Sequence, residues 1–292
     1  MANENVTTTQ LANSLVTEYR PGFMTAANEE MVIAKRFFDG TAGAQKLNNA
    51  LVIRKIAAAS AQSAAGTASI SLTGTNLTFN QNTEASVTAS PSFIYSGVIL
   101  TYPSLLRVRD DAQLKAAYKQ QILASLATQI DVTAGNLATS LSTNIVAAAN
   151  VDKSSVLACI GKLVENGKDH FKIGQTQAHF ILYNKQAVNL MNIAELTAAY
   201  SRGDKANPLV SGWMFEALNS TFEESGNIYT GGGATAHNLV LTDDSHVIAY
   251  GMKPQLLEPQ PTGAAILFLA IAEHGEAEVF DEYAVDYQTS SA

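Results

Sequence analysis

The sequence predicts an α+β protein, and three features of the 292-residue chain support this prediction. Between residues 50 and 100, apolar and polar residues alternate with the two-residue period of strands buried on one side. Between residues 110 and 145, apolar residues recur every three or four positions, as on one side of a long helix. Between residues 151 and 258, strand and helix patterns alternate, which indicates a compact α/β unit.

The chain is apolar and carries little charge. Hydrophobic residues make up 47% of the sequence, but charged residues make up only 15%, against about 25% in typical soluble proteins. Between Ile56 and Leu106 the one charged residue is Glu84. An uncharged strand edge invites pairing with another chain, and the cores of protein interfaces are depleted in charge. We therefore expect copies of the chain to cover this stretch.

Other classes of protein are disfavoured. No stretch approaches the roughly 18 consecutive apolar residues of a membrane-spanning helix, and the longest apolar run, residues 264–272, predicts a buried strand. The net charge of -8 argues against a protein that holds nucleic acid through its phosphates. Residues 1–5 lack the basic and apolar regions of a secretion signal, so we expect folding in a cytoplasm.

The N-terminal third predicts an arm, one helix and a long β-loop. Residues 1 to about 25 are polar and weakly patterned, which is typical of an extended arm. Residues 28–38 have an apolar side and predict a helix. Alternating patterns predict strands at residues 51–56, 69–73, 77–79, 85–88 and 93–100. The segment from about 50 to 92 is expected to project as paired strands, which need another surface to lie on.

A helix of unusual length is predicted after Pro103. The pair Asp110 and Asp111 supplies negative charge that suits a helix N-terminus, and the apolar stripe continues to Ile145. About 35 residues at about 1.5 Å each give a rod of roughly 50 Å. Gly135 lies inside the pattern and is a candidate kink.

The remaining elements build the α/β unit and return from it. A helix is predicted at residues 153–166 before Gly167, a buried strand at 178–183, and a helix through Leu190. The further predicted strands are 239–241 and 247–250, joined across 243–245, and then about 265–272 and 277–288.

The sequence contains no motif that indicates a catalytic, cofactor-binding or metal-binding site. No zinc-ligand spacing links the histidines, so structural roles are expected for His170, His179, His237, His246 and His274. Cys159 occupies an apolar position of a helical pattern and is expected to be a buried, inert thiol. The run Gly231-Gly232-Gly233 lacks the Lys and Ser/Thr of a phosphate-binding loop and predicts a turn. We expect no catalytic, cofactor-binding or metal-binding residue, and no enzyme.

Two further patterns have both a functional and a structural interpretation. The group Glu273, His274, Glu276, Glu278, Asp281 and Glu282 could hold a hard cation through its carboxylates. Glu276 and Glu278 lie two apart on one strand face, however, and a solvated acidic face is favoured. Residues 202–204 spell the integrin-type tripeptide Arg-Gly-Asp, which three residues also form by chance.

Three stretches carry a resemblance to a known family. Residues 95–103, Tyr-Ser-Gly-Val-Ile-Leu-Thr-Tyr-Pro, precede the long helix, and residues 126–131 within it are similar to a frequent Leu-Ala-x-x-Ile-Asp segment. Residues 274–280 are similar to a closing aromatic-Gly-x-x-Val stretch, with His274 in place of the aromatic residue. With the arm and the β-loop, their order resembles the major capsid proteins of tailed bacteriophages. Their Hong Kong 97 fold is shared with bacterial encapsulins.

The resemblance implies a division of the chain into five segments. The segments are an N-terminal arm, residues 1–48; an extended loop (E-loop), 49–93; a peripheral domain with a long spine helix, 94–150; an axial domain near the capsomer centre, 151–258; and returning strands of the peripheral domain, 259–292.

The resemblance also implies a structural protein of the virion, made and assembled in the host bacterial cytoplasm. Its copies would form pentamers and hexamers of an icosahedral shell that encloses double-stranded DNA without sequence-specific binding. A portal, a separate scaffold and decoration proteins are the implied partners, and no cofactor is implied. Two alternatives remain at this point: an encapsulin-type compartment that carries cargo enzyme, and an enzyme with an unrecognised site. The long loop favours the viral shell.

Overall fold

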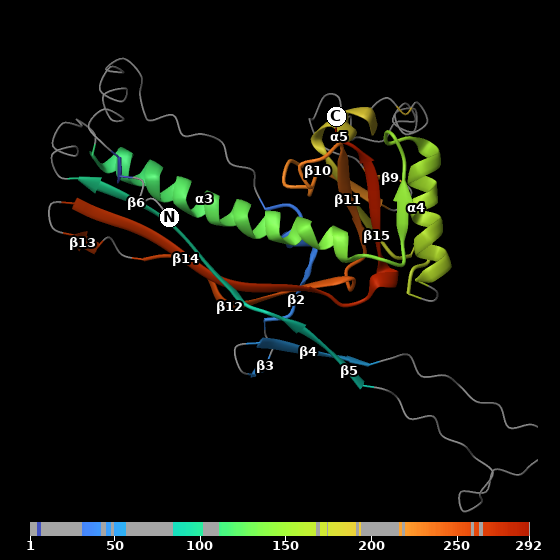
Figure 1. Ribbon diagram of the computed structural model, residues 1–292, viewed down its shortest axis with the longest axis horizontal. Coiled ribbons are helices and arrows are strands. Elements are labelled where there is room, and N and C mark those ends of the chain that lie inside the picture. Colours follow the sequence, from blue (N-terminus) through green and yellow to red (C-terminus); the bar gives the residue numbers. More distant parts are fainter. Residues whose placement is uncertain are drawn as a thin grey trace, which may run out of the picture.

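A computed structural model of the chain contains two lobes and a projecting ribbon (Figure 1). The structure describes residues 5–6, 31–41, 45–47, 50–56, 84–101, 111–167, 170–173, 175–190, 193, 216–217, 220–257, 260–262 and 265–291.

The spine lobe consists of one long helix lying along a sheet. The helix α3 spans Asp111–Asn136 and continues as the 3-10 turn η2, Leu137–Ser140. The sheet has the order β1-β6-β14-β12-β2, and β13 pairs with β14. Its strands are β1 (Asn5–Val6), β2 (Phe38–Asp39), β6 (Ser92–Thr101), β12 (His246–Leu256), β13 (Gln260–Thr262) and β14 (Ala265–Glu278).

The α/β lobe is a second sheet that carries two helices. The sheet has the order β7-β15-β11-β8-β10-β9. Its strands are β7 (Ile145–Ala147), β8 (Ala178–Tyr183), β9 (Glu216–Ala217), β10 (Ser220–Ser225), β11 (Thr235–Leu241) and β15 (Ala284–Ser290). The helices are α4 (Lys153–Asn166) and α5 (Asn184–Leu190), and the 3-10 turn η4 (Asp281–Tyr283) precedes β15.

The ribbon is a small antiparallel sheet that extends away from both lobes (Figure 1). It consists of β3 (Gln45–Leu47), β4 (Ala50–Ile56) and β5 (Glu84–Ala89), with Ile56 opposite Glu84. The strands predicted at 51–56 and 85–88 are confirmed. Those predicted at 69–73 and 77–79 lie outside the described residues, as does most of the predicted arm.

The two lobes share one hydrophobic core. On the α/β sheet, Phe180 and Leu182 pack against α4, whereas Ile181 points to the opposite face. There Ile181 joins Ile130 and Ala134 of α3 and Ile248 of β12 in one buried cluster. The end of α3 is therefore enclosed between the two sheets, which fixes the position of one lobe against the other.

Several predicted elements match closely, and α4 is the clearest case. It has the predicted bounds because Asp152 and Ser155 form a capping box: the Ser155 N–H donates to Asp152 Oδ1 at 2.7 Å, and the Asp152 N–H donates to Ser155 Oγ at 3.0 Å. The buried strand at 178–183 and the helix through Leu190 are also confirmed.

The predicted helix at 28–38 is wrong within its described part. Only the 3-10 turn η1, Ala34–Arg36, forms, and Phe38 is already in β2. The N–H groups of Val32, Ile33 and Ala34 all donate to Oδ1 of the buried Asp131, at 3.0, 2.6 and 2.9 Å. These contacts anchor the segment on α3, so a tertiary interaction overrides the local helical pattern.

The long helix is shorter than predicted. It ends at Asn136, and Ile145 lies in β7. The prediction ran too far because the apolar pattern continues beyond the helix through η2, and Ala138 and Leu141 join the shared core. The helix continues through Gly135, where a Cβ would lie 2.7 Å from the carbonyl oxygen of Asn227. Gly135 thus permits a close backbone approach between the lobes.

The C-terminal strands also differ from prediction. β14 runs unbroken through Glu273 to Glu278, and β15 begins only at Ala284, in the other sheet. Strands β11 and β12, expected to be joined partners, lie in different lobes. Strand β12 precedes residue 258 but belongs to the spine-lobe sheet, and β15 follows it but belongs to the α/β sheet. The division of the chain into five segments stays a prediction.

Candidate assembly surface

One face of the spine-lobe sheet packs against α3, and the other is apolar and turned outward. On β6, Ile94, Val98 and Leu100 belong to the buried cluster beneath α3. The alternate residues Phe93 and Tyr95 therefore point the other way, with 58% and 51% of their surface exposed.

Strand β14 extends this outward face. Its residues opposite Tyr95, Gly97 and Ile99 are respectively Ile271, Leu269 and Leu267, and all three are partly exposed. A residue with a Cβ would not fit at position 97 without a shift of the backbone. The Cβ would lie 2.9 Å from the carbonyl oxygen of Phe268 and 3.2 Å from Leu269 Cδ1. We call Phe93, Tyr95, Ile99, Leu267, Leu269 and Ile271 the outer apolar face.

The base of the chain's own ribbon covers the neighbouring part of the same sheet side. Ala89 of β5 is buried with Val247, Ala249 and Ala277, and Val87 packs against this group. Gly275 permits this approach, because a Cβ there would lie 3.1 Å from the carbonyl oxygen of Ser90. A ribbon strand is thus already shown to fit this side of the sheet.

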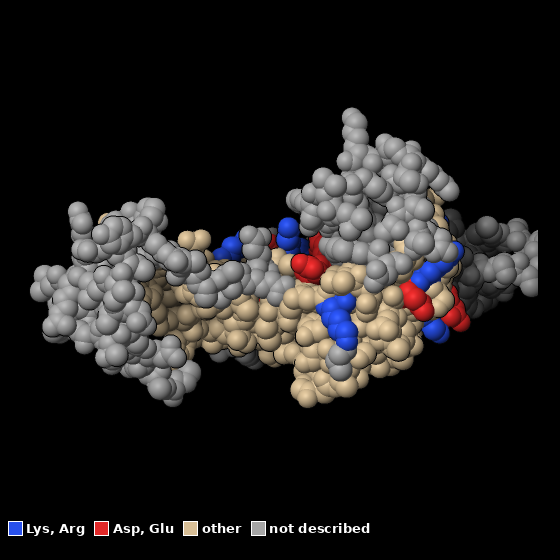
Figure 2. Space-filling view, turned by 90° about the horizontal axis from the view of Figure 1, so that it is seen from above, with Lys and Arg blue, Asp and Glu red and all other residues tan. Residues whose placement is uncertain are grey.

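The face of the spine lobe that carries α3 is poor in charge. Seen from above, uncharged residues cover most of it, and the charged side chains gather in a few small groups (Figure 2). This agrees with the low charge content of the whole chain, 15%. A surface of this composition resembles the core of a protein interface more than an ordinary solvated surface.

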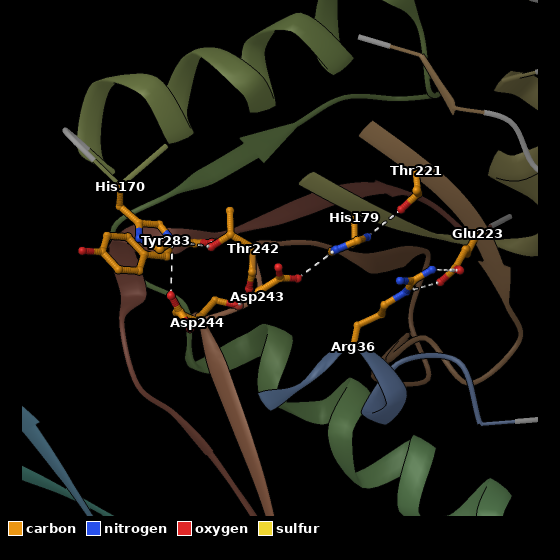
Figure 3. Close-up of polar contacts among 10 residues, drawn as sticks. Arg36, His170, His179, Thr221, Glu223, Thr242, Asp243, Asp244 and Tyr283 are labelled. Atoms are coloured by element: carbon orange, nitrogen blue, oxygen red, sulfur yellow. Dashed lines mark hydrogen bonds and ion pairs between the residues drawn. The ribbon is translucent and has the colours of Figure 1, made fainter. Parts of the chain in front are cut away.

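Several separate polar contacts lie where the two lobes meet (Figure 3). Arg36 of η1 forms a two-pronged ion pair with Glu223 of β10, in which Nε donates to Oε2 at 2.9 Å. This hydrogen bond raises the pKa of Arg36. His179 of β8 lies 3.1 Å from Asp243 and 2.6 Å from Thr221 through its two ring nitrogens. The contacts link segments far apart in sequence, so no local pattern could have predicted them.

The five histidines all have structural surroundings. His170 stacks on Tyr283 with ring centroids 3.9 Å apart, and His237 Nδ1 lies 3.1 Å from Asp286. The remaining ones are His179, described above; His246, stacked on Phe37; and His274, beside Glu276.

The prediction of a solvated acidic face is wrong for Glu276. Its side chain is only 2% exposed, and Oε1 lies 3.1 Å from Nδ1 of the equally buried His274. Both residues point toward α3, because they alternate with Ala277 on the opposite face. Burial raises the pKa of Glu276, although neighbouring His274 lowers it in part.

The other positions considered in the sequence analysis are a cysteine, a glycine run and a tripeptide. Cys159 is buried in the core of the α/β lobe, and burial raises the pKa of its thiol. Gly231 and Gly232 adopt positive φ of 57° and 68° in the turn before β11, as the glycine run predicts. Residues 202–204 lie outside the described part of the chain.

The described residues contain neither a metal-binding cluster nor a membrane-spanning helix. Within the ranges given above, no group of three or more His, Cys, Asp and Glu side chains is arranged to hold a metal ion. Among the helices described, none is long and apolar enough to cross a membrane.

Comparison with known proteins gives a clear result only at the level of structure. Neither family models nor curated protein sequences give a match. The capsid of Ralstonia phage GP4 superposes with a TM-score of 0.68 at 10% identity, covering 94% of this chain and 96% of that one. The chain has the fold of a phage capsid protein.

Two further capsids extend the comparison. The capsid of the cyanophage P-SCSP1u matches with a TM-score of 0.67 at 11% identity, over 94% of both chains. The capsid of the Helicobacter pylori bacteriophage KHP30 matches with 0.65 at 12% identity, over 96% of this chain and 97% of that one. The match covers nearly the whole chain, and the α+β fold class is confirmed.

Proposed function

We propose that the chain is a structural major capsid protein, whose copies assemble as pentamers and hexamers into an icosahedral shell around phage double-stranded DNA. The observation that carries the proposal is the capsid fold, which matches over almost the full length of both chains. A fold alone does not define a function. The outer apolar face and the projecting ribbon supply the second argument, because Val87 and Ala89 at the base of the ribbon already pack on the adjoining part of that sheet side.

In the assembly we propose, the ribbon of each copy lies on the outer apolar face of a neighbour. The ribbon of a chain already packs Val87 and Ala89 on the adjoining part of that sheet side, so the contact between copies would continue an existing mode of packing. Strand edges supply backbone hydrogen bonds, and the outer apolar face supplies buried area. Many such weak contacts in a closed lattice give a stable shell.

The charge of the chain suits an enclosing wall rather than a nucleic-acid binder. A net charge of -8 repels phosphates, so the inner wall would hold DNA without adsorbing it. We propose that the protein resides in the virion, after assembly in the host cytoplasm. A portal, a separate scaffold and decoration proteins would be its partners, and no enzymatic activity is proposed.

Electron microscopy of the purified chain in negative stain tests the proposal. We expect closed shells, or capsomers that close into shells when a scaffold is added. Small cages filled with a cargo enzyme would favour the encapsulin-type alternative, and stable monomers would contradict both. A reconstruction with an inner wall lined by lysine and arginine would refute the role assigned to the negative charge.

A further inference from the structure

A pocket of about 330 Å³ opens where the underside of the spine lobe meets the α/β lobe. Its walls come from β2, the turn before β12, the segment around η4 and the loop after α4. The residues that define its character are Phe38, His170, Asp244, His246, Phe280 and Tyr283. Sites for small molecules typically have volumes of about 300 to 1,000 Å³, so this pocket suits one or two side chains.

Aromatic rings form most of the wall. Tyr283 is stacked on His170 with ring planes 8° apart, and Phe280 packs on Tyr283 with centroids 4.7 Å apart. Phe38 stands at the rim with 57% of its surface exposed. These contacts hold the rings in fixed positions, and an aromatic wall attracts both apolar stems and cations.

Carboxylates lie at the pocket. Asp244 lies 4.0 Å from His170 Nε2, and its side chain is 59% exposed (Figure 3). Burial raises the pKa of Tyr283, and the carboxylates of Glu282 and Asp244 raise it further. Among the described residues, none of those that line the pocket is a lysine or arginine. A cation would therefore be favoured over an anion here.

His246 contributes a fully buried, neutral ring to the wall of the pocket. Ser245 Oγ donates to the carbonyl oxygen of Thr242 at 2.8 Å, so it accepts from His246 Nδ1 at 3.1 Å. The other ring nitrogen, Nε2, therefore has no proton. Burial lowers the pKa of His246 to about 4, which keeps the ring neutral at neutral pH. Within the described residues, Nε2 has no hydrogen-bond partner.

We propose that this pocket receives a lysine or arginine side chain from a neighbouring copy in the shell. The inference rests on the proposed capsid function. The aliphatic stem of the basic residue would lie along Phe38 and Phe280, and its charged head would meet Asp244. A neighbouring copy fits better than a small cation, because the exposed Phe38 at the rim offers apolar area that only a larger partner covers.

Photo-crosslinking in shells of mixed isotope content tests the proposal. Phe38 is replaced by a benzoyl-phenylalanine in unlabelled protein, which is assembled with ¹⁵N-labelled protein that lacks the photo-reactive group. We expect crosslinks between light and heavy chains, to a peptide with a lysine or arginine at or next to the linked residue. The same group at Ile173, which is 69% exposed and does not line the pocket, should not link to that peptide.

A charge variant makes the test specific. Asp244→Asn should lower the yield of that crosslink by about threefold, as loss of a partly exposed ion pair predicts. Glu165→Gln is the matched control, because Glu165 is similarly exposed and lies outside the pocket. If shells form normally but crosslinks join residues of one copy only, this proposal is refuted and the capsid function stands. The same holds if Asp244→Asn leaves the yield of the crosslink between copies unchanged. If no shell forms, the capsid function itself fails, and this proposal fails with it.

Discussion

His274 and Glu276 lie side by side on the α3 face of β14, with Nδ1 and Oε1 3.1 Å apart and both side chains at most 2% exposed. The approach lacks the alignment of a hydrogen bond, so within the described structure neither ring nitrogen and neither carboxylate oxygen has a hydrogen-bond partner. Asp131 of α3 contributes a second negative charge nearby. A buried pair of this kind makes stability depend on pH, because its polar atoms have little to compensate for the loss of water.

The Glu276→Gln variant should remove part of that pH dependence. Burial raises the pKa of Glu276 above its ordinary 4.5, so above pH 4.5 the folded chain holds a proton that the unfolded chain releases. The contribution of Glu276 to stability is therefore complete below pH 4.5 and is lost as pH rises through the raised pKa. The loss is about 1.4 kcal/mol for each pH unit that separates the pKa values of the folded and unfolded chain. Urea unfolding of unassembled wild type and variant from pH 4 to 7 should show a shallower fall for the variant. Parallel curves would contradict this prediction.

Asp131→Ala should strongly destabilise the spine lobe. The substitution leaves the N–H groups of Val32, Ile33 and Ala34 and the side-chain amide of Asn227 without their acceptor. One buried unsatisfied group costs about 1 to 3 kcal/mol, so we expect a loss of at least about 3 kcal/mol in the free energy of unfolding. Gln129→Ala, at an exposed position of the same helix, should change it by less than about 0.5 kcal/mol.

Two glycine-to-alanine substitutions should have opposite effects. In α4, a Cβ at Gly161 would have no atom within 4 Å, so Gly161→Ala should stabilise the unassembled chain by up to about 1 kcal/mol through helix propensity. In α3, a Cβ at Gly135 would lie 2.7 Å from the Asn227 carbonyl oxygen and 3.1 Å from Ile33 Cδ1. Gly135→Ala should therefore lower the melting temperature, whereas Gly161→Ala raises it. Equal shifts would contradict the close approach between the lobes.

Phe93→Asp should separate assembly from folding. Phe93 is 58% exposed, but an aspartate there would lie opposite Glu273 of β14. The free energy of unfolding of the unassembled chain should therefore fall by about 1 kcal/mol at most, which leaves the chain folded. A carboxylate on the outer apolar face would be desolvated under a neighbour's ribbon, which should abolish closed shells. Phe93→Leu keeps the position apolar and should assemble. Light scattering and electron microscopy compare the three proteins, and normal shells from Phe93→Asp would remove this face from the proposed interface.

The local elements were predictable because short-range chemistry defines them. The capping pair Asp152 and Ser155 set the start of α4, and alternation set β5 and β6. Partner choice was not predictable, since β11 and β12 follow one another in sequence yet lie in different sheets. The burial of Glu276 also escaped prediction, because a strand pattern does not reveal which face a long helix will cover.

The sequence indicated part of the candidate assembly surface but none of the contacts between the lobes. The low charge between Ile56 and Leu106 led us to expect a stretch that other copies cover. Which residues form the outer apolar face became visible only from the pairing of β6 with β14. The junction contacts of Arg36 with Glu223 and of His179 with Asp243 gave no such signal. They join residues 187 and 64 positions apart, and only the folded chain brings them together.

The described chain passes between its two lobes three times: from η2 into β7, from β11 into β12, and from β14 through η4 into β15. A protease that cuts one of these crossings leaves the lobes joined by the other two. Domain swapping, the exchange of a whole lobe between neighbouring copies, is easiest when a single hinge segment joins the lobes. A threefold covalent tether prevents it, so each copy enters a growing lattice as one indivisible unit.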